Sequence, residues 1–148
     1  MRLSEHFTLA EAMKSQTALR LGIDNTPPST VLLRLGAVAE YILEPCRRHF
    51  GQPIVPSSWY RCPALNRAIG GKESSQHVLG EAVDFEVPGI SNVELARYIQ
   101  DNLPYDQLIL EFFDGSPHSG WVHASYSARH LRQAMVFDGE NYTAGLPA

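Results

Sequence analysis

The sequence is poor in cysteine and contains no long apolar run. Its two cysteines, Cys46 and Cys62, have fifteen residues between them, a spacing that matches neither metal nor redox Cys-x-x-Cys motifs. We therefore expect two reduced, structural thiols. No apolar segment approaches the roughly 20 residues that span a bilayer, and the first residues lack the apolar stretch of a secretory signal. The sequence thus predicts no membrane span and a protein that is cytoplasmic on synthesis.

A basic surplus is also absent. The 148 residues include 12 Lys and Arg against 16 Asp and Glu, a formal net charge of −4. Proteins that bind nucleic acid without sequence preference usually carry a positive balance, so no nucleic-acid partner is expected. Apolar residues make up 44% of the chain, an ordinary globular mixture that excludes a disordered or fibrous protein. The length predicts a single domain over residues 1–148, and we expect a monomer.

Capping signals and apolar periodicity predict four helices. Thr8 followed by Glu11 forms a capping box, and Ser29 precedes the most strongly periodic apolar stripe of the chain. Pro45 is expected to end or kink this second helix, and Gly51 to close the region. The predicted helices cover residues 9–14, the stripe from 29 toward 45, residues 63–69, and a segment from the second capping box at 91–94 to about 102.

The second half of the chain is predicted to form a sheet. Residues 82–87 alternate between apolar and acidic side chains, which is typical of a strand. Residues 107–113 and 121–126 are rich in strand-forming types and flank a turn-rich loop, so they predict a hairpin. Residues 133–137 are a candidate edge strand, and residues 141–148 are expected to be irregular. This order predicts an α+β fold with an antiparallel β-sheet and helices packed against it.

Two of the six histidines stand out by their neighbours. His77 lies seven residues before Asp84, which the strand pattern places between two apolar residues. Burying an unpaired carboxylate costs several kcal/mol, so a cation near Asp84 is expected. The alternatives are a capped turn or a salt bridge of Asp84 to Arg61 or Lys72.

His123 completes a candidate metal site. Two imidazoles and one carboxylate form a common set of three protein ligands for catalytic zinc, with a fourth position left for water or substrate. An iron(II) site of two histidines and one carboxylate is a weaker alternative, because such sites usually place His and carboxylate closer in sequence. His6, His49 and His130 have no clear partner and are expected to be surface or packing residues.

Hairpin geometry brings a second carboxylate toward this site. If Phe113 pairs with Trp121, antiparallel register places Glu111 opposite His123 on the same face of the sheet. Glu111 would then serve either as a general base or as a partner that orients a histidine ligand. A slip of one residue would turn Glu111 to the other face.

The motif around His77 resembles that of a known enzyme family. Ser75, His77, Gly80, Ala82 and Asp84 match, place for place, the S-x-H-x-x-G-x-A-x-D signature of zinc D-alanyl-D-alanine carboxypeptidases and dipeptidases. The metal-binding domain of these enzymes is similar to that of hedgehog signalling proteins and of several phage endolysins.

Two other segments carry the same resemblance. S-S-W-Y-R-C-P-A-L-N, at residues 57–66, is similar to the S-G-Y-R-x-P-x-x-N element of the carboxypeptidase branch, and W-V-H-A-S resembles the strand with the last metal ligand. The resemblance covers residues 3–127. It implies a hedgehog-like peptidase fold, with zinc held by His77, Asp84 and His123. It also implies that Arg61 and Ser75 face the substrate, where a guanidinium can bind a peptide carboxylate through two hydrogen bonds.

The sequence departs from the family at the position of the catalytic acid or base. The carboxypeptidase branch has a second histidine two residues before the last ligand, where this chain has Trp121, and the dipeptidase branch has a glutamate three residues before it, where this chain has Gly120. Glu111 is the expected substitute, followed by His118 and then Asp114. Trp121 is expected either to form an apolar side of the substrate site or to pack on the sheet. Trp59 and Tyr60 could line the cleft, but we expect them to serve mainly as packing residues.

Together these features predict a zinc-dependent peptidase that hydrolyses peptidoglycan stem peptides containing D-alanine. With no secretory signal, it would act on the cell wall after release by another route, as phage or prophage endolysins do. The alternative is a non-catalytic zinc module that binds wall peptides or a protein partner, because the usual base is missing.

Overall fold

The computed structural model describes residues 1–148 as a group of helices followed by a five-stranded sheet, with one further helix between the first two strands. The helices are α1 (Leu9–Met13), α2 (Gln16–Leu21), α3 (Ser29–Val38), η1 (Ala39–Leu43, a π-helix), α4 (Glu44–Phe50), α5 (Pro63–Ala68) and α6 (Asn92–Asn102). The strands are β1 (Ala82–Phe85), β2 (Gln107–Glu111), β3 (Trp121–Ser125), β4 (Gln133–Phe137) and β5 (Tyr142–Ala144). The α+β class is therefore confirmed.

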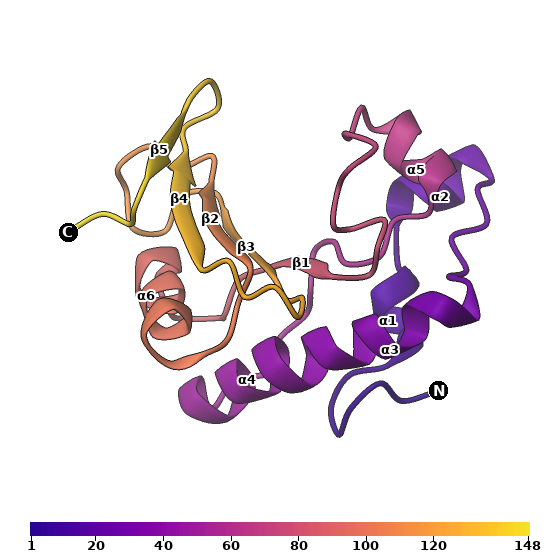
Figure 1. The fold of residues 1–148 in the computed structure, drawn as a ribbon, viewed down its shortest axis with the longest axis horizontal. Coiled ribbons are helices and arrows are strands. Elements are labelled where there is room, and N and C mark those ends of the chain that lie inside the picture. The colour runs from indigo at the N-terminus through magenta and orange to yellow at the C-terminus, as the bar shows by residue number, and fades with distance from the viewer.

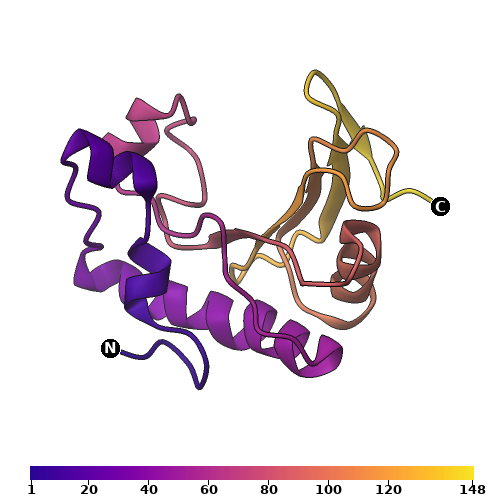
Figure 2. The ribbon, with the colours of Figure 1, turned by 180° about the vertical axis from the view of Figure 1, so that it is seen from behind.

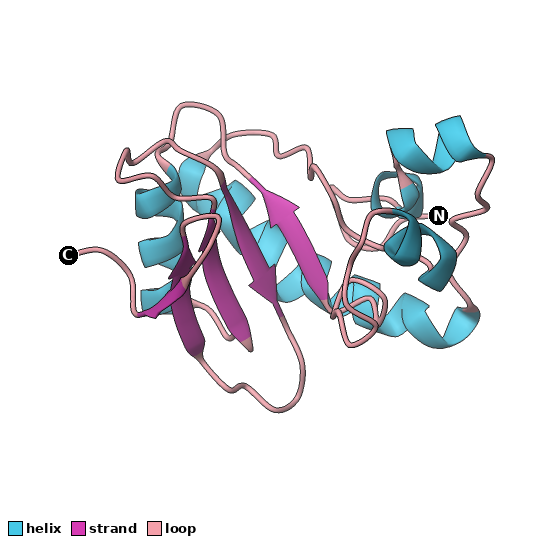
Figure 3. Cartoon of the chain, turned by 90° about the horizontal axis from the view of Figure 1, so that it is seen from above, coloured by secondary structure: helices cyan, strands magenta, loops and turns pink.

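Helices α3, η1 and α4 follow one another from residue 29 to residue 50 and form a long helical rod. Figure 1 shows α3 and α4 in one line, with α1, α2 and α5 near one end and the sheet with α6 over the other. Figure 2 shows the same arrangement from behind, and Figure 3 shows the sheet and the small helices as two groups side by side. One hydrophobic cluster of 27 buried residues includes side chains from both groups. None of the helices has the length and hydrophobicity that a membrane span requires.

Pro45 was expected to end or kink the helix; the helix continues through it, so an end at this residue is wrong, and the irregularity is the π-helical turn before it. Proline lacks a backbone N–H, and its ring crowds the carbonyl four residues earlier. In the π-helical turn before it, the backbone N–H of Glu44 donates to the carbonyl of Ala39, five residues back. This wider turn makes room for the ring. The helix ends instead at Gly51, as predicted, with φ of 66°.

Two elements were not expected from the sequence. Helix α2 begins after Ser15, whose hydroxyl accepts a hydrogen bond from the backbone N–H of Ala18, and ends at Gly22 with φ of 67°. Both are ordinary capping signals. The tail, expected to be irregular, contains β5, which pairs with β4. The first strand is also shorter than predicted and ends at Phe85.

The sheet is mixed rather than antiparallel, which corrects the prediction. Its strand order is β1-β3-β2-β4-β5, and β4 pairs with β2 in parallel while the other neighbours are antiparallel. The segment at residues 126–132 stays at the end of the sheet where β3 ends and β2 begins, so β4 enters in the direction of β2. β4 therefore extends the sheet on the side of β2 that faces away from β3.

The hairpin register differs from the predicted one by two residues. Glu111 lies opposite Trp121, and His123 lies opposite Ile109. Since side chains alternate along a strand with a period of two, this shift leaves Glu111 on the same face as His123. The opposite face of β2 and β3 is fully buried, at Leu108, Leu110, Val122 and Ala124, and α6 contacts both strands.

Both cysteines are buried and free, in agreement with the expectation of structural thiols. Burial raises the pKa of the Cys46 thiol to about 12, so it stays protonated and unreactive. The sulfur of Cys62 accepts a hydrogen bond from the backbone N–H of Leu65 and thereby caps α5.

Candidate metal centre

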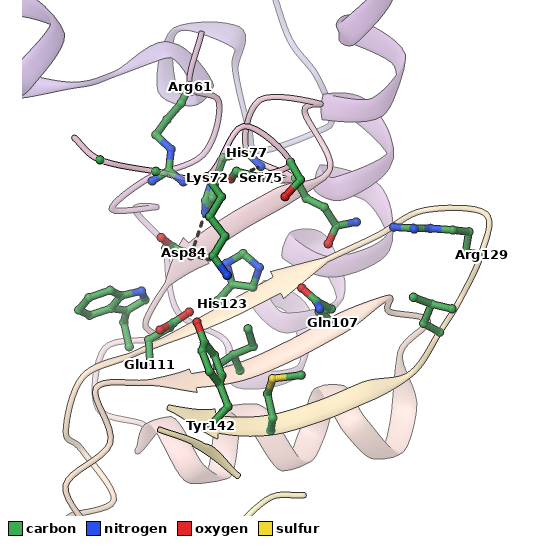
Figure 4. Close-up of a pocket in the computed structure, with 18 residues that line it drawn as sticks. Arg61, Lys72, Ser75, His77, Asp84, Gln107, Glu111, His123, Arg129 and Tyr142 are labelled. Atoms are coloured by element: carbon green, nitrogen blue, oxygen red, sulfur yellow. Dashed lines mark hydrogen bonds and ion pairs between the residues drawn. The ribbon is translucent and has the colours of Figure 1, made fainter. Parts of the chain in front are cut away.

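The three predicted ligands meet at one end of the sheet. Asp84 on β1 lies directly opposite His123 on β3, so both side chains project from the same face. His77 reaches them from the loop before β1. Its Nε2 atom lies 3.3 Å from Oδ1 of Asp84, and Nδ1 of His123 lies 2.9 Å from the same oxygen. Figure 4 shows the three side chains turned toward one another.

The chemistry of this set suits a metal ion. One donor atom from each residue lies within 4.8 Å of the others. The second ring nitrogen of His77, Nδ1, lies 2.6 Å from the carbonyl oxygen of Trp59, which can only accept. Nδ1 must therefore carry the proton, and Nε2 presents its lone pair toward Asp84. Two imidazoles and a carboxylate with an open side fit a zinc ion.

Asp84 contacts the two histidines rather than Arg61 or Lys72. Burial opposes ionisation of Asp84, but His77 and His123 hold the pKa of its carboxyl group well below the ordinary value. Burial lowers the pKa of His77, against the opposing effect of Asp84. An ionised carboxylate and a neutral imidazole are the forms that bind metals.

Glu111 lines the same cleft as the three ligands. Figure 4 shows its carboxylate below His123, in the space between the strands and the loop that carries His77. Burial raises the pKa of Glu111; His123 opposes this rise and Asp84 adds to it. A raised carboxyl pKa suits a group that must accept a proton and then release it near neutral pH.

The glycine that replaces the family glutamate is required by the backbone. Gly120 has φ of 60°, and a Cβ atom added there would collide with the backbone carbonyl of Glu111. A glutamate cannot occupy position 120 without moving the hairpin. Trp121, the next residue, faces the cleft opposite Glu111, and its buried Nε1 atom has no hydrogen-bond partner.

The other two candidates for the base lie away from the ligands. His118 and Asp114 are exposed in the loop between β2 and β3 and do not line the cleft. Asp114 accepts a hydrogen bond from the backbone N–H of Ser116 and so stabilises the turn. We call His77, Asp84 and His123 the metal set. Of the three candidates for the base, the structure thus brings only Glu111 toward it.

Arg61 and Ser75 lie beside the metal set and line the cleft. Nη2 of Arg61 donates a hydrogen bond to the hydroxyl oxygen of Ser75 at 3.1 Å. The same oxygen accepts a hydrogen bond from the backbone N–H of His77. The buried Nε atom of Arg61 has no partner. Burial lowers the pKa of Arg61, although Asp84 opposes the change. The guanidinium therefore keeps donor capacity for a ligand in the cleft.

Trp59, Tyr60, His49 and His6 make packing or hydrogen-bond contacts outside the cleft. Trp59 is 1% exposed and its ring contacts that of Phe7, and Tyr60 is also buried, as predicted. His49 stacks on Tyr98 at 4.0 Å. Nδ1 of His6 donates a hydrogen bond to the buried carboxylate of Glu44 at 2.8 Å.

His130 completes this group: its ring lies against Tyr126, at 5.2 Å between centroids. None of these histidines lines the cleft that holds the metal set.

Sequence reasoning overlooked Asp106, which organises the rim of the cleft. Its fully buried carboxylate accepts hydrogen bonds from Gln76, the residue before His77, and from Ser127, Arg129 and the backbone of Leu131. Asp106 directly precedes an apolar strand, so the reasoning applied to Asp84 would have marked it as a carboxylate that needs partners.

Comparison with known proteins identifies a family. The model of the family described as Peptidase M15 matches residues 5–125, which include the three metal-set residues, Arg61, Ser75 and Glu111. No curated protein matches the chain. Strands β4 and β5 lie beyond the matched residues.

Proposed function

The chain belongs to the Peptidase M15 family, and on this premise we propose that it is a zinc-dependent peptidase that hydrolyses D-alanine-containing stem peptides of bacterial peptidoglycan. The observation that carries the proposal is the set of His77, Asp84 and His123 donor atoms within 4.8 Å of one another, at the base of a cleft that Glu111 also lines. Zinc, when bound by these residues, would polarise the scissile carbonyl group and lower the pKa of water toward neutrality.

Glu111 is the proposed general base. Its carboxylate would accept a proton from the attacking water and then donate it to the leaving amine. Its placement on the face of His123 and its raised pKa, caused by burial, both support this role. Trp121, directly opposite on β3, would keep bulk water from this carboxylate.

Arg61 and Ser75 are the proposed substrate-binding residues. The guanidinium lines the cleft, and its planar fork suits the carboxylate at the end of a peptide. The hydrogen bond from Arg61 to Ser75 fixes the direction of both side chains. A substrate carboxylate at Arg61 would place the neighbouring peptide bond over the metal set.

The test compares the parent protein with Glu111→Gln on synthetic stem peptides, with products identified by mass spectrometry and zinc content by elemental analysis. We expect cleavage by the parent, its loss with a chelator and its return with zinc. Glu111→Gln should keep zinc and lose about 10²–10⁴-fold in kcat. Glu40→Gln, on the exposed surface of the rod, is the matched control and should retain full activity. Cleavage that survives the chelator would overturn the proposal.

The second candidate is a zinc module that binds wall peptides or a protein partner without cleaving them. It is favoured by Gly120 and Trp121, which occupy the positions of the family's usual acid or base. Binding of zinc and peptide by the parent, with no turnover of any stem peptide, would establish it. The same elemental analysis distinguishes zinc from iron.

The resemblance to phage endolysins supports a further part of the proposal, that the protein acts on the cell wall after release from a cell. Purified cell-wall sacculi incubated with the zinc-loaded protein should release soluble peptides. Intact sacculi beside cleaved synthetic peptides would restrict the activity to soluble substrates.

A further inference from the structure

The C-terminal strands outside the family match form one wall of the cleft. Met135 on β4 and Tyr142 on β5 line it together with Arg129 and Leu131 from the preceding loop. In Figure 4, Tyr142 projects into the cleft toward Glu111, from the side away from Arg61. The family match therefore explains the metal set but leaves this wall unassigned.

A straight row of side chains connects the metal set to this wall. Asp84 pairs with His123, His123 with Ile109, and Ile109 with Met135. All four project from one face, because directly paired residues share a face in both parallel and antiparallel ladders. The row begins with two metal-set residues and continues as an apolar floor.

The ring of Tyr142 is held in place although 57% of the residue is exposed. It stacks on Phe137 at 4.6 Å between ring centroids. Phe137 contacts Phe112 at 5.2 Å, and Phe112 contacts Trp121 at 5.2 Å. This chain of four rings ties β5 to the Trp121 side of the cleft, so Tyr142 offers a positioned apolar surface.

The direction of a bound peptide follows from the strand order. Arg61 lies beyond β1, since nearby Ser58 forms a bridge with Asp84, whereas β4 and β5 lie at the opposite edge of the sheet. A peptide whose carboxylate binds Arg61 must therefore extend its amino-terminal part toward Met135 and Tyr142.

We propose that Ile109, Met135 and Tyr142 form a subsite for an extended aliphatic side chain, on the amino-terminal side of the scissile bond. This rests on the proposed function for the placement of the peptide. β4 lies two strands from β3, about 10 Å away. One peptide unit places the next residue about 3.8 Å from the scissile bond. A four-carbon side chain on that residue covers the remaining distance to β4.

The test uses acetyl-X-D-alanyl-D-alanine, with X as glycine, alanine or norleucine. Dissociation constants are measured by calorimetry on the metal-free protein, and kcat/KM on the zinc-loaded protein. Each methylene group fully removed from water is worth about fourfold in affinity. We expect the norleucine peptide to bind the parent at least about tenfold tighter than the glycine peptide.

Variants locate the preference. Tyr142→Ala and Met135→Gln should each bring the norleucine-to-glycine ratio below about threefold while the affinity for the glycine peptide stays constant. Tyr142→Phe keeps the ring and should keep the ratio. Tyr41→Ala, at an exposed aromatic on the rod outside the cleft, is the matched control and should also keep it. If Tyr142→Ala fails to fold, Met135→Gln decides.

Equal affinities for the three peptides, or no measurable affinity, would overturn the subsite. If the preference for norleucine survives both Tyr142→Ala and Met135→Gln, the side chain binds elsewhere and the proposed subsite is also overturned. Discrimination in binding without any cleavage would reject the proposed peptidase activity alone, whereas cleavage without discrimination would reject the subsite alone.

Discussion

Replacement of Asp106 by alanine should destabilise the protein and loosen the rim of the cleft. The Asp106 side chain is fully buried, and its two oxygens accept four hydrogen bonds of 2.8–2.9 Å. The donors come from Gln76 in the His77 loop and from three residues of the segment between β3 and β4. Without the carboxylate these two segments lose their common anchor.

The size of the loss follows from the exposure of the donors. Arg129 is 61% exposed in its side chain and can return to water, so its ion pair contributes little. Ser127 is buried and Gln76 is half-buried, and each of these two unpaired donors costs about 1–3 kcal/mol. We expect a total of about 3–5 kcal/mol in the free energy of unfolding. For 148 residues, that corresponds to a fall in Tm of about 10–15 °C.

Thermal and urea unfolding, followed by circular dichroism at pH 7, measure this loss. Asp106→Asn retains an acceptor oxygen and should lose less than Asp106→Ala. Asp101→Ala, at an exposed position of α6, is the control and should stay within about 0.5 kcal/mol of the parent. A loss below about 1 kcal/mol in Asp106→Ala would refute the anchoring role of the carboxylate.

The pH dependence gives an independent check on Asp106. Burial opposes ionisation, but the Leu131 N–H and the other donors lower the pKa of this carboxyl group below 3.8. Its stabilising effect is therefore fully present above pH about 3.8 and is lost as the pH falls through the lower folded-state pKa. Asp106→Asn should lack this acid-dependent part of the unfolding free energy.

Three further predictions follow from the site and the rod. Because burial raises the pKa of Glu111, this carboxyl group should titrate at a higher pH than an ordinary glutamate in the metal-free protein, as followed by NMR; titration at the ordinary pH would contradict the role of burial. Gly120→Ala should cost at least about 2 kcal/mol in urea unfolding, because φ is positive and the new Cβ meets the Glu111 carbonyl; a neutral effect would contradict this backbone requirement. Zinc at 100 times its dissociation constant should stabilise the protein by about 2.7 kcal/mol, or about 9 °C in Tm; an Asp84→Ala variant that responds equally would exclude this site.

Local patterns in the sequence determined most of the helices and strands. Capping residues fix helix ends through hydrogen bonds to groups a few positions away, so Thr8 and Ser91 marked α1 and α6 correctly. The signature from Ser75 to Asp84 is equally local and predicted two of the metal ligands, while the strand segment W-V-H-A-S predicted the third, His123. The fold brings the three donor atoms within 4.8 Å of one another. The face of Glu111 was also predictable, since strand alternation is a property of the backbone.

Only the tertiary structure decided how distant segments pair. The parallel placement of β4 beside β2 depends on the path of the segment after β3, and the register of Glu111 against Trp121 depends on the turn at Gly120. Strand β5 gains its stability from contacts with β4 and from the rings beside Tyr142 rather than from its own three residues. Pairing partners far apart in the chain are selected by packing and hydrogen bonding across the sheet, which no local pattern records.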